Sequence, residues 1–457
     1  MKKILLSLIT ILMPLALLAQ EAGDNFTIKT TDGKTTEWSL AGGNKNGDIS
    51  IIKHNGNKLE LYAKGYENTG ACQTYNLDKI ENITFSVFHK GDYKEESAVN
   101  AVKNMGIGTN FGNCTDAVAM WLNMGNNSVT DFEKAWGQEP TTKPMVDFLK
   151  KNGFNSVRIP VTWFQHMKED GTVDEAWMNR IQEIVDYVID NGMYCILNVH
   201  HDTGADDKDV KHWIKADEAN YKENKEKFEY LWTQIATRFK NYDQHLVFEG
   251  YNEMLDADNT WNAPKSASSY KGLNEYAQSF VNAVRATGGN NETRNLIINT
   301  YAAANGDDVL NHLVIPTDKV DGHIAVEVHT YAPWDWFAQK GKWDASCSNE
   351  IKNMFTRLSN KFISKGIPCI IGEYGTHGSK SVSKTSSASE IQAAADQAAD
   401  IVKQAKAYGV ATFYWMSIFS EKDRSVPQWT LPTVVEAMKK AVSYTHLRAH
   451  ETAANLV

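Results

Sequence analysis

The sequence predicts an α/β protein whose main part is a (β/α)8 (TIM) barrel, preceded by a small β-rich N-terminal segment. Eight short apolar runs alternate with amphipathic stretches of helical length over about 340 residues. The runs lack polar alternation, which is typical of buried parallel strands. Polar residues gather at their carboxyl ends, where a barrel presents its functional groups. An open doubly wound sheet is the alternative, and the lack of a Gly-rich phosphate turn after the first run argues against it.

Composition indicates a large globular chain. Of its 457 residues, 42% are hydrophobic and 23% are charged, which excludes wholesale disorder. The net charge is −9 and no long basic run occurs, so we expect no nucleic-acid partner. Five cysteines are too few for a disulfide-stapled mini-protein, and their odd number leaves at least one thiol unpaired within the chain.

Residues 1–19 are expected to be a signal peptide. Lys2 and Lys3 form a basic start, Ile4–Leu18 is mostly apolar, and Ala19 ends the run among small residues. The apolar stretch is too short and too interrupted for a membrane-spanning helix, although an N-terminal anchor is the alternative. We therefore expect no membrane insertion and a secreted protein, either extracellular or periplasmic.

Residues 20–98 form the β-rich leader. Asp-Gly, Gly-Gly and Asn-Gly turns separate its short predicted strands. Examples of these strands are Phe26–Lys29, Ile49–Lys53, Lys58–Ala63 and Ile83–Val87, and Gly91–Ala98 is the expected linker. The few aromatic residues of the leader (Trp38, Tyr62, Tyr66 and Tyr75) form no recognisable sugar-binding platform. A spacer or docking role is favoured over carbohydrate binding.

Residues 99–441 are assigned to the barrel. The eight apolar runs are Met105–Asn110, Ser156–Val161, Tyr194–His200, His245–Glu253, Asn295–Tyr301, His323–Tyr331, Pro368–Gly375 and Val410–Ser417. Between them, Asp174–Asp190 shows the clearest helical pattern, with its apolar residues on one face. Residues 442–457 break the character of the preceding helix and resemble a translated sequencing adapter, so we expect a non-native tail; a frayed helix end is the alternative.

The ends of these runs carry the candidate site. The residues there are Asn110, Arg158, His200, His201, Asn252, Glu253, His329, Tyr331, Glu373 and Trp415. Burial of a lone carboxylate is costly, so Glu253 and Glu373 need a chemical reason for their positions. Strands four and seven of an eight-stranded barrel face each other across its mouth. The pair is therefore placed for hydrolysis of a glycosidic bond, in which one carboxyl is protonated and the other attacks the anomeric carbon.

Several segments together resemble glycoside hydrolase family five, over about residues 104–441. They are Ser156-Val-Arg-Ile-Pro-Val-Thr-Trp163, Asn198-Val-His-His-Asp202, Phe248-Glu-Gly-Tyr-Asn-Glu253, Val328-His-Thr-Tyr331 and Ile371-Gly-Glu373-Tyr. The sequence is most similar to the branch with β-1,4-endoglucanases and xyloglucanases. The resemblance implies Glu253 as acid/base and Glu373 as nucleophile. Asn252 would hold the 2-hydroxyl of the sugar being cleaved, and Arg158 and Tyr331 would keep the nucleophile ionised and oriented.

The same resemblance implies roles around the two carboxylates. His329 would lie beside the acid/base, His200 and His201 would line the sugar cleft, and Trp415 would form the floor under the reacting sugar. Asn110 matches an Asn of the family's first-strand motif. Two departures put subsite detail in doubt. Thr109 replaces a common Trp, and Met254 replaces the Pro that often follows the acid/base.

We expect a retaining endo-β-1,4-glucanase that acts on cellulose-type glucan, mixed-linkage β-glucan or xyloglucan, as a monomer. An endo-β-1,4-mannanase and a non-catalytic glycan-binding barrel are the alternatives. We expect no cofactor and no metal, because adjacent strand residues such as His200 and His201 point to opposite faces. Glu249 is expected to support the structure. We expect a raised pKa for Glu253 and a lowered one for Glu373.

Six tryptophans lie in predicted loops, and the sequence cannot sort stacking platforms from packing residues. They are Trp121, Trp213, Trp261, Trp334, Trp336 and Trp343.

Overall fold

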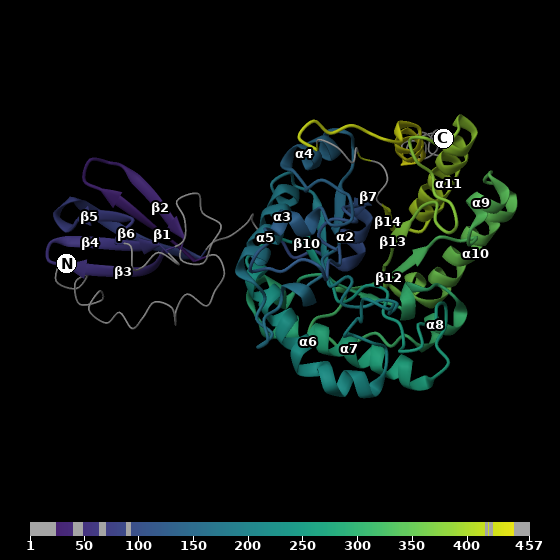
Figure 1. Cartoon of the computed structure of the whole chain (residues 1–457), viewed down its shortest axis with the longest axis horizontal. Helices are drawn as coiled ribbons and strands as arrows, with labels where there is room; N and C mark the ends of the chain where they lie inside the picture. The colour runs from purple at the N-terminus through teal and green to yellow at the C-terminus, as the bar shows by residue number, and fades with distance from the viewer. Residues whose placement is uncertain are drawn as a thin grey trace, which may run out of the picture. The chain divides into compact units, whose positions relative to one another are not determined.

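The computed structural model describes residues 24–39, 49–63, 70–87, 93–415, 419 and 424–442 (Figure 1). The predicted signal peptide, and all of the predicted tail except Val442, lie outside these residues. The described leader strands belong to one of two compact units, and the barrel strands belong to the other. All five cysteines are free thiols.

The leader consists of two small antiparallel sheets that share one core. The first sheet has the order β2-β1-β6 and the second β3-β4-β5. Their strands are β1 (Asp24–Thr30), β2 (Thr35–Ser39), β3 (Ile49–Asn55), β4 (Lys58–Ala63), β5 (Gln73–Asn76) and β6 (Ile80–Val87). Phe26 and Ile28 of one sheet pack with Leu59 and Leu61 of the other. Trp38 is buried in this core, and its indole N–H donates to the Tyr75 hydroxyl at 3.0 Å.

The eight apolar runs form the strands of a closed parallel barrel, which confirms the predicted fold. The strands are β7 (Ile107–Asn110), β8 (Ser156–Ile159), β9 (Tyr194–Asn198), β10 (Leu246–Glu249), β11 (Leu296–Asn299), β12 (Ile324–Thr330), β13 (Cys369–Tyr374) and β14 (Ala411–Tyr414). Every residue of these strands is buried, as the lack of polar alternation predicted.

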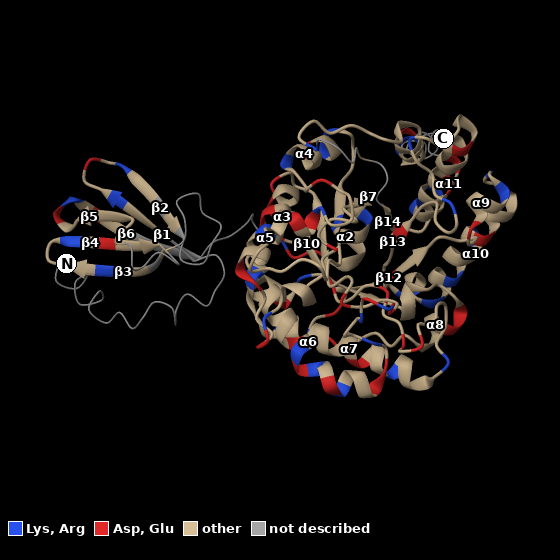
Figure 2. Ribbon diagram, viewed as in Figure 1, with Lys and Arg blue, Asp and Glu red and all other residues tan. Residues whose placement is uncertain are grey.

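Helices surround the barrel (Figure 1). The longer ones are α4 (Lys143–Lys151), α5 (Glu175–Ile189), α6 (Glu218–Phe239), α7 (Ala267–Ala286), α10 (Ala345–Lys361), α11 (Ala388–Ala407) and a helix over 432–442. Helix α5 matches the predicted helix, and the Asp174 carboxylate caps it by accepting from the backbone N–H groups of Ala176 and Trp177. Acidic and basic residues are interspersed along α6 and α7 (Figure 2). Among the described helices, none combines the length and hydropathy needed to cross a membrane.

The barrel interior has an apolar layer near the amino ends of the strands and a polar layer near their carboxyl ends. Helix α2 (Ala98–Met105) closes the amino end, where Val102 and Met105 pack with Ile196, Val247 and Phe413 of the strands. Two residues further along the strands, the inward positions are polar. These residues are Asn110, Arg158, Asn198, Glu249, Asn299 and Glu327, and they are linked by hydrogen bonds or ion pairs. The polar layer supports the carboxyl end of the barrel.

Candidate active site

Arg158 on β8 is the centre of the polar layer and is completely buried. Its Nε and Nη2 donate to the two oxygens of Glu249 at 2.6 and 2.7 Å. Nη1 donates to Asn110 Oδ1 at 3.0 Å and to Glu373 Oε1 at 2.9 Å, and Nη2 donates to Asn252 Oδ1 at 2.8 Å. The planar guanidinium thereby fixes Glu373 and Asn252 relative to each other.

Two predicted substrate contacts are occupied by protein partners. Arg158 is wholly buried, and Asn110 donates from Nδ2 to the Gly372 carbonyl at 2.9 Å while its oxygen accepts from Arg158. Both side chains therefore position other groups. Asn252 uses only its oxygen for Arg158, and within the described residues its amide nitrogen has no protein acceptor. This nitrogen is free for a sugar hydroxyl.

Glu373 on β13 has an oriented carboxylate. Its Oε1 accepts from Arg158, and its Oε2 accepts from the Tyr331 hydroxyl at 2.7 Å. The side chain is 6% exposed. Burial raises the pKa of Glu373, the charges of His329 and Arg158 lower it, and the charge of Glu253 adds to the rise.

Glu253 follows β10 and lies opposite, more open to solvent. Its side chain is 21% exposed, and its Oε1 lies 2.9 Å from Nδ1 of His329. Burial alone would raise the pKa of Glu253, but the hydrogen bond and charge of His329 outweigh it and hold this pKa below its ordinary value. The predicted directions, raised for Glu253 and lowered for Glu373, are therefore wrong for the free protein. The family resemblance placed His329 beside Glu253, but the sequence could not show that this imidazole is buried among carboxylates that favour its protonated form.

One oxygen of Glu253, one oxygen of Glu373 and one nitrogen of His329 all lie within 4.8 Å of one another. Carboxyl groups about 5–5.5 Å apart characterise retaining glycosidases, and inverting enzymes separate them by about 6.5–9.5 Å. The short distance between one oxygen of each carboxylate fits the spacing of the retaining class better than that of the inverting class.

Glu327 is a buried carboxylate that the sequence analysis did not select. It lies on β12, two residues before His329, and its Oε1 lies 3.2 Å from His329 Nε2. The signal was present in the sequence. Glu327 and His329 lie two residues apart in β12, which places both on the same face of the strand, and Tyr331 directly follows the strand.

His200 and His201 lie beyond the end of β9, so the alternation of strand side chains does not apply to them. Their rings are in contact, with centroids 4.5 Å apart, and Asp116 from the loop after β7 lies 3.8 Å from His201 Nε2. One ligand atom from each of the three residues falls within 4.8 Å of the other two. The reason given for excluding a metal pair is therefore wrong, and the site needs a separate test.

The hydrogen bonds of His200 argue against metal ligation. The Asn198 oxygen accepts from the Val161 backbone N–H, which directs its amide nitrogen to His200 Nδ1 at 3.0 Å. An amide nitrogen only donates, so Nδ1 is the acceptor and Nε2 carries the hydrogen. His200 then has no lone pair for a metal on its free side. Burial lowers the pKa of His200 well below its ordinary value, so the ring is neutral.

Trp415, at the end of β14, lies parallel to His200, with ring centroids 5.9 Å apart and planes 9° apart. A Cβ at Gly112 would lie 2.8 Å from the Trp415 ring, so only glycine fits beside this indole. Trp415 is half-buried and leaves part of its surface accessible at the barrel end.

A cavity of about 450 Å³ opens beside Glu253, His329 and Tyr331. Trp261 and Trp334 line it and are 50% and 64% exposed. The structure thereby separates these two exposed tryptophans, which could stack on a sugar, from loop tryptophans that pack against protein. Trp336 is buried, and the Trp343 indole is held by Asp400 at 2.8 Å.

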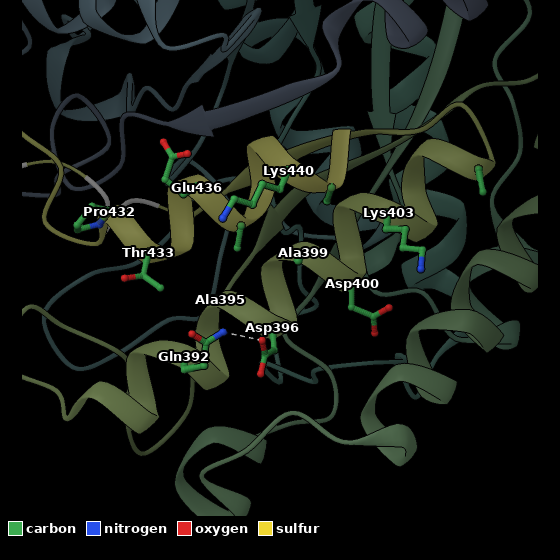
Figure 3. A pocket seen from close by; sticks show the side chains of 13 residues that line it. Gln392, Ala395, Asp396, Ala399, Asp400, Lys403, Pro432, Thr433, Glu436 and Lys440 are labelled. Carbon is green, nitrogen blue, oxygen red and sulfur yellow. Dashed lines mark hydrogen bonds between the residues drawn. The ribbon is translucent and has the colours of Figure 1, made fainter. Parts of the chain in front are cut away.

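A larger cavity, of about 1190 Å³, lies between α11 and the helix over 432–442, on the outside of the barrel (Figure 3). Its lining includes Asp396, Asp400, Lys403, Glu436 and Lys440, and none of the site residues above. Size alone would therefore locate the site wrongly. The smaller cavity adjoins the paired carboxylates, the imidazole and exposed indoles.

Comparisons with known proteins identify the family of this chain. Cellulase/esterase CelE of Acetivibrio thermocellus is 34% identical over 372 residues, or 76% of this chain, and the chain spans 41% of that relative. Endoglucanase 1 of Ruminococcus albus is 34% identical over 82% of this chain and 87% of its own length. A solved glycoside hydrolase family 5 enzyme of Prevotella bryantii B14 is 57% identical, with a TM-score of 0.74, over 77% of this chain and 99% of its own. A sequence model described as Cellulase (glycosyl hydrolase family 5) matches residues 116–420, and the chain belongs to this family.

Proposed function

We propose that this protein hydrolyses β-1,4-glucosidic bonds within polysaccharide chains and retains the anomeric configuration. The observation that carries the proposal is the short spacing of Glu253 and Glu373, whose surroundings differ. Arg158 and Tyr331 hold Glu373 in place, whereas Glu253 is the more exposed carboxylate and adjoins the cavity. These differences support Glu373 as nucleophile and Glu253 as acid/base.

In the first step, Glu373 attacks the anomeric carbon while Glu253 protonates the departing oxygen. A covalent glycosyl-enzyme forms and the leaving chain departs. In the second step, Glu253 removes a proton from water, which attacks the same carbon and releases Glu373. Two displacements restore the original anomeric configuration.

Proton NMR of the first products from a soluble β-glucan tests this mechanism. The β anomer should appear before mutarotation, and an initial α anomer would contradict the two-step mechanism. Glu373→Ala should abolish turnover on every substrate, because no intermediate can form without the nucleophile. Retained glycan binding with no turnover in the wild type would instead favour the non-catalytic glycan-binding barrel.

For the substrate, we infer a preference for mixed-linkage β-glucan and xyloglucan over crystalline cellulose. A variant of the Prevotella bryantii enzyme, 56% identical to this chain, has been solved in complex with a xyloglucan tetradecasaccharide. In this chain, Trp261 and Trp334 line an open cavity, and the aromatic residues of the leader form no recognisable platform for a crystal face. A reducing-sugar panel of carboxymethyl cellulose, mixed-linkage glucan, xyloglucan and mannan tests this preference. Highest activity on mannan would instead identify an endo-β-1,4-mannanase.

We also propose that the protein is exported and acts as a monomer. The basic start and apolar run of residues 1–19 support export. Both carboxylates and their hydrogen-bond partners come from one chain, which supports action as a monomer. N-terminal sequencing of the exported protein and light scattering test the two points. An intact residue 1, or a dimer whose dissociation abolishes turnover, would contradict them.

A further inference from the structure

We propose that Glu327 is a positioning residue that acts through His329, so that the proton delivered to the leaving group reaches Glu253 from His329 Nδ1. The inference rests on the proposed role of Glu253 as acid/base. It adds one carboxylate and one proton transfer to the reaction described above.

The geometry is a chain of carboxylate, imidazole and carboxylate. His329 Nδ1 lies 2.9 Å from Glu253 Oε1, and His329 Nε2 lies 3.2 Å from Glu327 Oε1. When both carboxylates are ionised, both ring nitrogens face acceptors, and the ring satisfies them by donating from each nitrogen. When the ring carries a single hydrogen, Glu327 keeps that hydrogen on Nε2, which leaves Nδ1 as the nitrogen that gives up its proton.

Glu327 is well fixed for this role. Its side chain is completely buried, and its Oε1 lies 3.3 Å from Arg158 Nε. The neighbouring strand has glycine at residue 372, where a Cβ would lie 1.8 Å from Glu327 Oε1. Among the described residues, Glu327 Oε2 has no hydrogen-bond partner, so the strongest available partners of this carboxylate are Arg158 and His329.

The charges around His329 favour its protonated form in the free protein. The groups that face His329 or its partners are Glu253, Glu327, Glu373, Glu249, Arg158, His200 and Tyr331. Four carboxylates here share one arginine, so a proton on the imidazole reduces an excess of buried negative charge. Burial opposes this charge, but the carboxylates outweigh burial and raise the pKa of His329 to about 10.

Substrate binding would move the proton. A bound sugar covers the 21% of the Glu253 side chain that solvent now reaches, and removal of water destabilises the ion pair relative to its neutral form. The Nδ1–H bond breaks and an O–H bond forms on Glu253. Glu253 then gives this proton to the glycosidic oxygen as the C1–O bond breaks. In the second step, Glu253 takes a proton from the attacking water and returns one to His329 when the product leaves, so the net reaction consumes one water.

Glu327→Gln tests the proposal because it removes the charge but keeps the size. We expect kcat/KM on mixed-linkage glucan to fall about 100-fold, the scale of general acid catalysis. The alkaline limb of its pH profile should move to lower pH by about one unit, because a negative neighbour of His329 is lost. The first step on 2,4-dinitrophenyl cellobioside should change less than about three-fold, because an activated leaving group needs no acid.

A matched control is Glu133→Gln, which alters a buried carboxylate paired with Arg180 outside the site. This variant should lose stability and keep the wild-type pH profile. Equal losses of Glu327→Gln on polymer and on the aryl glycoside, or an unmoved alkaline limb, would overturn the proposal. A wild-type protein that cleaves no β-glucan would instead contradict the proposed function.

A second measurement needs no variant and holds even if Glu327→Gln fails to fold. In wild-type protein labelled with 15N-histidine, NMR at pH 7 should show both ring nitrogens of His329 protonated. A neutral His329 ring in the free protein would overturn the proposal.

Discussion

The Glu327 carboxylate on β12 occupies the space that Gly372 leaves open on β13. A Cβ at residue 372 would lie 1.8 Å from Glu327 Oε1 and 2.3 Å from its carboxyl carbon. The glycine one residue before the proposed nucleophile therefore leaves room for a carboxylate on the neighbouring strand. The two residues link the positions of Glu373 and His329.

Gly372→Ala should displace Glu327 and destabilise the protein by about 2 kcal/mol or more, because overpacking a buried site forces neighbours to shift. Urea unfolding measures the change. Gly306→Ala is the matched control, because a Cβ there meets nothing within 4 Å and its φ of −73° suits any residue. Equal stability of the two variants would contradict the close packing of Glu327 and Gly372.

Arg158→Lys should lower kcat at least about 100-fold, since a lysine cannot hold Glu249, Glu373 and Asn252 in one planar fork. Initial rates on mixed-linkage glucan measure the loss. Arg180→Lys is the matched control, because Arg180 makes a similar two-nitrogen contact with Glu133 at 2.6 and 3.1 Å away from the site. It should cost stability and leave kcat unchanged. A similar fall in kcat for both variants would mean that Arg158 acts only through folding.

Trp334→Ala should raise KM for soluble glucan about five-fold, which corresponds to about 1 kcal/mol of aromatic contact. It should change hydrolysis of a short aryl glycoside less, because that substrate has fewer sugar rings to contact this indole in the cavity beside Glu253. Trp121→Ala, at a more exposed indole that does not line this cavity, is the control. An equal rise of KM in both variants would place the polymer contact elsewhere.

Acid should destabilise the fold through His166. Its ring stacks on Trp177 with centroids 3.6 Å apart, and burial lowers its pKa to about 3. Below pH 6.5, His166 becomes protonated in the unfolded chain but stays neutral in the folded protein. Stability is therefore lost as the pH falls from about 6.5 towards 3, by up to about 1.4 kcal/mol per pH unit.

His166→Phe should remove this dependence, because the ring and its stacking are kept without a titrating nitrogen. Urea midpoints at pH 7 and pH 5 measure the effect. The variant should gain stability relative to the wild type as the pH is lowered. A constant difference between the two proteins at both pH values would show that His166 does not titrate in this range.

Dialysis against EDTA should leave turnover intact, because displacement through two carboxylates needs no metal. Hydrolysis rates and the melting temperature before and after dialysis measure this. A large loss of rate at an unchanged melting temperature, restored by a single divalent ion, would contradict the metal-free mechanism.

Much of the fold could be predicted because it depends on patterns along the chain. Eight unbroken apolar runs indicated eight buried strands, and Asp174 marked the start of α5. The leader strands β2 and β5 have weak local signals, because they are short, polar in sequence and stabilised by pairing with neighbours. The sequence showed no sugar-binding platform around Trp38 but did not place its side chain, which is buried between two sheets whose contact no local pattern reveals.

For the candidate site too, some features follow from local sequence and others depend on tertiary contacts. The sequence by itself determined which residues lie at the carboxyl ends of the strands, because strand direction and periodicity are local properties. Only the tertiary structure decided the protonation of these residues, since a pKa depends on every charge within a few ångströms and on burial. The His329 imidazole lies against Glu253, Glu327 and Glu373, which are up to 120 residues apart, and so it reverses the expected pKa order of the two catalytic candidates.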